Sequence, residues 1–240
     1  VTTSDIQGTI AIGYQAILGA HGTSTNINGS IAIGHQALTA ITTGAQNTAI
    51  GYQALSTETG GAGNTAVGYR AGYQLAGTSN NNVIMGYGVM GGADTNGDNN
   101  VAIGYNVMAS NDLNTADNNV GIGYNALSAL TTGDNNVAVG AQSGNDITTG
   151  NQNVLMGKGT GEKITEGLKN TFLGYQAGAT LTTSDLNVLV GWQAGLAIAA
   201  GQTTTDATVA VGASALQSLT TGAGNVAVGY RALNACTTAG

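Results

Sequence analysis

Residues 47–55 read Asn-Thr-Ala-Ile-Gly-Tyr-Gln-Ala-Leu, and residues 225–233 read Asn-Val-Ala-Val-Gly-Tyr-Arg-Ala-Leu. Variants of this line recur along the chain around one glycine, which we call the repeat glycine. It stands at Gly13, Gly34, Gly51, Gly68, Gly86, Gly104, Gly123, Gly140, Gly157, Gly174, Gly191, Gly212 and Gly229. Seven of the twelve intervals are 17 residues long, and the others are 18, 19 or 21. One structural module copied end to end is typical of a solenoid.

The residues before the repeat glycine predict a β-strand. β-branched or large apolar side chains stand three residues and one residue before it, as in Val101 and Ile103. The residue between them is alanine in eight repeats, and it is larger in four: Ile84, Leu155, Phe172 and Leu189. Period-two alternation favours a strand, and apolar groups on both sides favour burial of both faces. We expect one face to close its own coil and the other to meet a neighbouring chain.

The residues after the repeat glycine predict a second short strand and a turn. Tyrosine follows the glycine in eight of thirteen repeats, and alanine stands two residues later in nine. The turns at 42–44, 131–133, 148–150 and 220–222 all read Thr-Thr-Gly, where we expect glycine to supply a positive φ. The predicted fold class is all-β, a parallel β-solenoid (β-roll or β-helix) of about thirteen 17-residue coils.

Two side-chain rows follow from stacking such coils. Asparagine stands four residues before the repeat glycine in ten repeats, and amides stacked about 4.8 Å apart form a structural ladder. The ladder comprises Asn47, Asn64, Asn82, Asn100, Asn119, Asn136, Asn153, Asn170, Asn187 and Asn225. The aromatic row comprises Tyr14, Tyr52, Tyr69, Tyr87, Tyr105, Tyr124, Tyr175, Trp192 and Tyr230. Its rings either bind sugar faces as an external stripe or pack against the next coil or another chain.

The amino-acid composition limits the kinds of partner that the chain is expected to bind. The 240 residues include 40 glycines and no proline, and the unbroken period predicts one repetitive shaft domain over 1–240, a segment of a longer fibre protein. A core of small side chains buries little apolar area, so self-association is expected. The net charge of −7 and five scattered cations argue against nucleic acid, and no apolar run is long enough for membrane insertion. Cys236, the single cysteine, is expected to be a small buried side chain.

The lines at 100–107, 119–126 and 225–232 resemble the repeats of phage tail fibres, and they are similar to the shorter head repeats of trimeric autotransporter adhesins. The likeness covers residues 9–233. It implies a homotrimeric fibre in which three parallel β-coils pack through small residues, and the alanines before and after the repeat glycine could supply that contact.

Motifs that could carry chemistry are sparse. Gly86–Gly91 has the letters of a dinucleotide fingerprint but no following helix, so no cofactor is expected. Asp117 and Asp134, one repeat apart, are the one candidate carboxylate pair for glycan cleavage. Residues 94–98 weakly match a calcium loop, whereas His21 and His35 lie too far apart for a catalytic or zinc site. We expect no catalytic or metal residues and no enzyme activity.

The expected function is the structural shaft of a trimeric attachment fibre on a virion tail, positioning or contributing to host-receptor binding. Its expected partners are two further copies of the same chain in a homotrimer, other fibre or baseplate proteins, and host surface glycan. The alternative is a trimeric autotransporter-type adhesin on a bacterial surface. Ice binding would need a flat threonine array, but the threonines here lie mainly in turns. The four-residue expansions before Gly34 and Gly212 are candidate contact loops.

Overall fold

The computed structural model describes residues 7–19, 26–75, 77–92, 97–110, 115–197 and 206–238. Within these residues ten strands end immediately before a repeat glycine, and β5, β6 and β7 end one residue after it. The strands are β1 (Ile10–Ile12), β2 (Ile31–Ile33), β3 (Thr48–Ile50), β4 (Thr65–Val67), β5 (Val83–Tyr87), β6 (Val101–Tyr105), β7 (Val120–Tyr124), β8 (Val137–Val139), β9 (Val154–Met156), β10 (Thr171–Leu173), β11 (Val188–Val190), β12 (Val209–Val211) and β13 (Val226–Val228). The predicted all-β parallel β-solenoid is confirmed.

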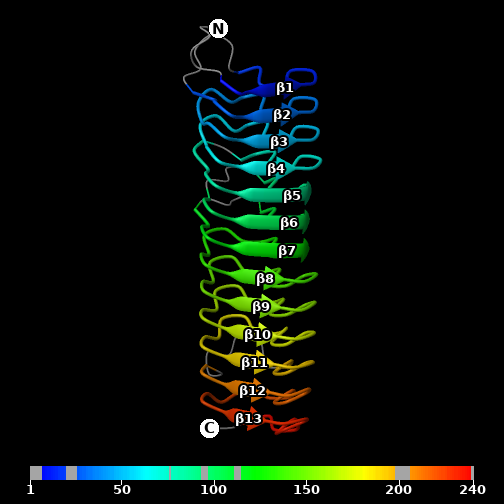
Figure 1. Ribbon diagram of the computed structural model, residues 1–240. Helices are drawn as coiled ribbons and strands as arrows, with labels where there is room; N and C mark the ends of the chain where they lie inside the picture. Colours follow the sequence, from blue (N-terminus) through cyan, green and yellow to red (C-terminus); the bar gives the residue numbers. More distant parts are fainter. Residues whose placement is uncertain are drawn as a thin grey trace. The chain divides into compact units, whose positions relative to one another are not determined.

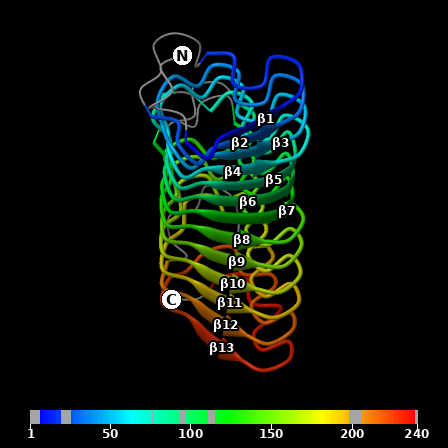
Figure 2. The same cartoon turned by 45° about the horizontal axis from the view of Figure 1, so that its top comes forward.

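The chain divides into two compact units, Val1–Asn119 with β1 to β6 and Val120–Gly240 with β7 to β13. Within each unit every strand pairs in parallel with the next, and identical repeat positions face each other, as Ala49 faces Ala66. Figure 1 shows the strands of each unit following one another in chain order, and the tilted view of Figure 2 shows each coil as a loop with its strand on one side. The expectation of one domain over 1–240 stays a prediction.

The strand turns its middle residue into the coil. Ala49 and Ala138, two residues before a repeat glycine, are fully buried, and so is Ala54, three residues after one. The expectation that these alanines contact another chain is therefore wrong. A 17-residue coil encloses a narrow space, and only small groups at these positions leave room for larger side chains from the rest of the coil.

Those larger side chains come from the fourth and seventh residues after the repeat glycine. They include Leu38, Ile41, Leu55, Leu75, Leu127, Leu130, Ile147, Ile164, Leu181, Leu216 and Leu219, all fully buried. The residues that flank the buried middle residue of the strand point the other way. Ile50 is 37% exposed, Met156 42% and Leu173 40%. Each unit thus has an outward row of aliphatic side chains on its strands, which we call the aliphatic face.

The segment after the repeat glycine is not a strand, and this prediction was wrong. Every second residue takes a left-handed conformation, with φ of 54° at Gln53 and 49° at Leu55. The Gln53 N–H donates to the His35 carbonyl of the preceding coil at 2.9 Å, and the Leu55 N–H donates to the Ala71 carbonyl of the next coil at 3.0 Å. These bonds between coils offset the roughly 1–2 kcal/mol that left-handed φ costs an L-residue.

Glycine is required at two corners of the coil, the repeat glycine and the Thr-Thr-Gly turn, for different physical reasons. Gly51 has φ of +138°, and a Cβ there would overlap the Gly68 carbonyl of the next coil. In the Thr-Thr-Gly turns, Gly44 and Gly222 have the expected positive φ of 94° and 113°. Gly133 and Gly150 do not, but a Cβ on Gly133 would overlap the Gly150 carbonyl. At Gly133 it is the close approach of the next coil, and not the sign of φ, that excludes a side chain.

Candidate functional site

The aromatic row of the first unit is a continuous stack of rings. Tyr14, His35, Tyr52, Tyr69, Tyr87 and Tyr105 follow one another with ring centroids 5.0 to 5.3 Å apart and planes within 25° of parallel. His35 fills the one repeat of this stack that lacks a tyrosine. His35 follows Gly34 as tyrosine follows other repeat glycines, and this position was the signal for its place in the row; His21 lies outside the described residues.

Stacking decides which part of each ring a ligand can reach. Inside the row each ring face is covered by the next ring, so the rings turn their edges and hydroxyls outward. A sugar that needs a ring face cannot stack on Tyr52 or Tyr69 without parting the row. In the second unit Tyr124, Tyr175, Trp192 and Tyr230 are exposed, and Ala141, Lys158 and Ala213 interrupt the aromatic positions. The stripe of sugar-binding ring faces is therefore not supported in the first unit.

A row of amides runs beside the aromatic row, one residue further along the chain. Gln36 Nε2 donates to Gln15 Oε1 at 2.8 Å, and Gln53 Nε2 donates to Gln36 Oε1 at 2.8 Å. Arg70 continues the row, because its Nε donates to Gln53 Oε1 at 3.1 Å. In the next coil the same position is Gly88, which has no side chain to continue the row.

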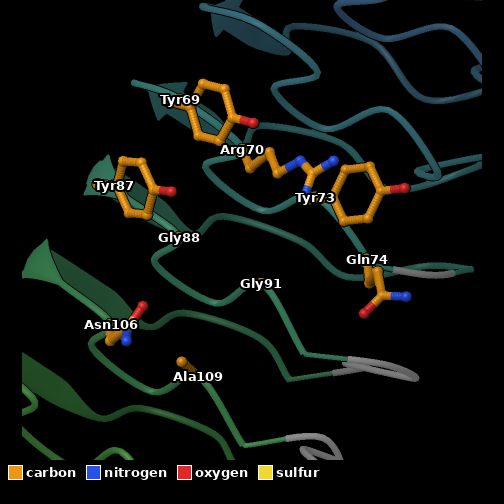
Figure 3. Close-up of a pocket in the computed structure, with 9 residues that line it drawn as sticks. All are labelled: Tyr69, Arg70, Tyr73, Gln74, Tyr87, Gly88, Gly91, Asn106 and Ala109. Atoms are coloured by element: carbon orange, nitrogen blue, oxygen red, sulfur yellow. The ribbon is translucent and has the colours of Figure 1, made fainter.

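A groove of about 340 Å³ opens where the amide row stops (Figure 3). Gly88 and Gly91 form its floor, with Arg70 in the coil before and Asn106 in the coil after. Arg70 also lies over two aromatic rings, its guanidinium carbon 5.5 Å from the Tyr69 centroid and 4.8 Å from the Tyr73 centroid. This groove was not among the sites predicted from the sequence. The available signal was Arg70 and Gly88 at the position where other repeats have glutamine, and Gly91 at a position where other repeats have a longer side chain.

The asparagine ladder lies inside the coils and satisfies backbone groups. In the first unit Asn64 Oδ1 accepts the Asn82 N–H at 3.0 Å, while Asn64 Nδ2 donates to the Ser79 carbonyl at 2.7 Å. In the second unit Asn153 Oδ1 accepts the Asn170 N–H at 3.0 Å. Nine of the ten predicted ladder residues are fully buried and Asn225, in the final coil, is half-buried. Each amide thus links its own turn to the adjacent coil, and the row has no surface for a ligand.

A second polar row, which the sequence reasoning missed, stands six residues before the repeat glycine. Asp98 Oδ1 accepts the Asn80 N–H at 2.6 Å, and Asp185 Oδ1 accepts the Leu168 N–H at 2.7 Å. Aspartate or asparagine fills this position in eight repeats: Asn28, Asn80, Asp98, Asp117, Asp134, Asn151, Asp185 and Asp206. The carboxylates of Asp98, Asp117, Asp185 and Asp206 each cap a backbone N–H of the preceding coil. The constant spacing of this row from the repeat glycine was the available signal.

The structure does not bring the remaining candidates together as a reactive site. Asp117 belongs to the first unit and Asp134 to the second. In the calcium-loop candidate, Asp94 to Asn96 lie outside the described residues, and Asp98 serves as a cap. Among the described residues, no three His, Cys, Asp or Glu side chains gather closely enough to hold a metal ion. Cys236 is half-buried rather than buried, and the two expanded loops fall mostly at 20–25 and 198–205, outside the described residues.

Glu58 is a buried carboxylate in a position that the fold reserves for aliphatic side chains. It stands seven residues after Gly51, where other coils have Ile41 or Leu75, and it is fully buried. Its Oε1 accepts the N–H groups of Gly60 and Gly61 at 3.0 and 2.7 Å, whereas Oε2 has no hydrogen-bond partner. Desolvation raises the pKa of the Glu58 carboxyl above its ordinary value, although the backbone N–H bonds act in the opposite direction.

In the parts of the chain that the structure describes, no helix has the length and apolar character needed to cross a bilayer. In comparisons with known proteins, no family model, no curated protein and no solved structure matches this chain.

Proposed function

We propose that the chain is the structural shaft of a homotrimeric attachment fibre, of the phage tail-fibre kind that its repeat line resembles. The observation that carries this proposal is the aliphatic face. Large apolar side chains stand outward in successive coils, and in internal coils Ile50 and Met156 are 37% and 42% exposed. Continuous apolar rows of this kind are uncommon on monomeric proteins and mark surfaces that another molecule covers.

Copies of the same chain are the occupant that this face fits best. In each unit the outward residues repeat at every coil because the strands pair in parallel register, as Val188 pairs with Val209 and Val190 with Val211. A copy with the same rise per coil presents matching rows along the same axis. With only 7% charged residues, the chain has few side chains that would oppose such contact.

A shaft also needs resistance to local opening, and three rows of bonds between coils supply it. The asparagine ladder, the row of Asp and Asn caps six residues before the repeat glycine, and the amide row each form hydrogen bonds between neighbouring coils. Aspartates such as Asp98 and Asp185 take part in these bonds between coils. On this proposal the shaft sits in a virion tail and joins other fibre or baseplate proteins at its ends.

Sedimentation equilibrium of the purified chain tests the assembly. The proposal expects a particle of about three times the 23.6 kDa chain mass at micromolar concentration. Val139→Glu places a charge on the aliphatic face and should yield monomers that keep their β-sheet circular dichroism. Thr149→Glu, in an exposed turn, is the matched control and should leave the trimer intact. A wild-type chain that sediments as a monomer would overturn the proposal.

A further inference from the structure

The groove at Gly88 has the features of a ligand site rather than of a packing defect. The groove forms because one side chain of the amide row is missing: Gly88 stands where glutamine joins neighbouring coils elsewhere in the row. Its volume of about 340 Å³ is at the lower end of small-molecule sites, which suits one sugar ring. Figure 3 shows Arg70, Tyr69, Tyr87 and Asn106 around a floor with no side chain from Gly88 or Gly91.

The charge of the groove selects an anion. Among the described residues that line it, Arg70 is the one charged side chain and no carboxylate is present. The hydrogen bond that holds Arg70 to Gln53 uses Nε, whereas an end-on carboxylate takes its two hydrogens from the Nη groups. Tyr69 and Tyr87, stacked face to face with centroids 5.0 Å apart, turn their electropositive ring edges outward rather than their faces. Arginine and ring edges together favour a negative group.

The remaining lining favours hydroxyl groups. The amides of Gln74 and Asn106 can each donate and accept hydrogen bonds, and the hydroxyls of Tyr69 and Tyr87 point toward the side where Arg70 and Gly88 lie (Figure 3). A ligand that carries both one carboxylate and several hydroxyls on a compact ring would satisfy all of these groups at once.

We propose that this groove binds an acidic monosaccharide unit of the uronic-acid class, with its carboxylate on Arg70 and its hydroxyls on Asn106, Gln74 and the tyrosine hydroxyls. The groove uses residues after the repeat glycine, whereas the aliphatic face uses residues before it. The inference concerns one coil surface and stands whether or not the chain forms a trimeric fibre.

The chain offers matched variants for the test. Arg70→Gln installs the residue that Gln15, Gln36 and Gln53 already provide in the same row, so it removes the charge and keeps the rung. Gly88→Gln fills the groove. The φ of Gly88 is 60°, close to the 54° of Gln53, and the new Cβ would meet only the side-chain oxygen Oδ1 of Asn106, at 2.9 Å. Gly159→Gln, at the equivalent position of the second unit with φ of 64°, is the control.

Isothermal titration of the full chain with glucuronic acid, glucose and glucose 6-phosphate measures the preference. We expect glucuronic acid to bind with a dissociation constant on the order of millimolar, and glucose to bind about 10-fold or more weakly because it lacks the charged group. Arg70→Gln should remove that preference, Gly88→Gln should abolish binding, and Gly159→Gln should change neither.

Three results would overturn the site: no binding of glucuronic acid, equal binding of glucose, or unchanged binding in Gly88→Gln. Binding of glucose 6-phosphate as tight as that of glucuronic acid would overturn the uronic-acid assignment, since it would indicate an anion site that does not select a carboxylate. Circular dichroism and sedimentation of each variant show that the coils and the assembly are kept. Loss of the trimer without loss of glucuronic acid binding would count against the shaft and not against this site.

Discussion

Phe172 and Gly178 share one space inside the coil of β10. A Cβ on Gly178 would lie 2.5 Å from Phe172 Cε2 and 2.9 Å from Leu189 Cδ1. Four other coils have the reverse arrangement, with alanine on the strand and leucine four residues after the repeat glycine, as in Ala49 and Leu55. The larger strand residues at 155, 172 and 189 are thus accommodated because glycine follows at 161, 178 and 195. In these three coils the large side chain has moved from the fourth residue after the repeat glycine to the strand.

Exchanging the two sizes tests this relationship. Phe172→Ala alone should lower the free energy of unfolding by about 3–5 kcal/mol, because it empties part of the core. Gly178→Leu alone should also destabilise, since its side chain overlaps Phe172. The double variant should recover part of the loss, because the φ of 58° at Gly178 is one that Leu55 adopts at 49°. Urea denaturation of the four proteins gives the coupling energy, and additive losses would contradict shared volume.

The repeat glycine predicts a contrast between inner and terminal coils. Gly140→Ala places a methyl group 2.5 Å from the Gly157 carbonyl oxygen and should destabilise by about 4 kcal/mol or more. Gly229→Ala meets nothing within 4 Å, and only its φ of +126° is unfavourable, so about 1–3 kcal/mol is expected. Thermal melts of both variants show how much of the destabilisation comes from overlap with the next coil and how much from the unfavourable φ. Equal losses would show that φ alone, and not the approach of the next coil, requires glycine.

Thr208 is a weak rung in the asparagine ladder that can be improved. Its N–H donates to Asn187 Oδ1 at 2.9 Å, but its own buried Oγ1 has no hydrogen-bond partner. Thr208→Asn supplies an amide oxygen for the N–H of Asn225, as Asn170 does for Asn187. We expect stabilisation of about 1 kcal/mol in denaturant titration. Thr149→Asn, on an exposed turn, is the control and should shift stability by less than about 0.5 kcal/mol. A loss of stability in Thr208→Asn would contradict the proposed acceptor.

Glu58 predicts a pH dependence that runs opposite to ordinary acid denaturation. Because burial raises its pKa in the folded state, the folded chain holds this proton at pH values where the unfolded chain has released it. The contribution of Glu58 is therefore fully present below the ordinary value of 4.5 and is lost as pH rises through the folded pKa. Glu58→Gln should raise the melting temperature at pH 8 and change it little at pH 4.

Exposed Glu166→Gln is the control for that comparison. It removes one carboxylate without touching the core, so its effect should not follow the pH course of Glu58→Gln. If Glu58→Gln stabilises equally at pH 4 and pH 8, the carboxyl does not titrate differently in the folded and unfolded chains.

Repeat spacing alone predicted the parallel β-solenoid, the thirteen strands and the positions of the asparagine and tyrosine rows. It could do so because identical residues at a constant interval must stack once the coils stack, whatever the path of each coil. The left-handed residues at Gln53 and Leu55 could not be predicted in this way. Their φ is unfavourable locally and is stabilised only by carbonyls of the neighbouring coils.

Only the tertiary structure decided which way each row faces. The alanines expected at a contact between chains fill the coil interior, and the valines and isoleucines beside them point outward. Of the two alternatives for the tyrosine row, the structure shows rings that pack on the next coil in the first unit, whereas the groove at Gly88 arises from a side chain that is missing. Period-two alternation identifies two faces of a strand but not the inner one, because that choice depends on the volume that the whole closed coil can enclose.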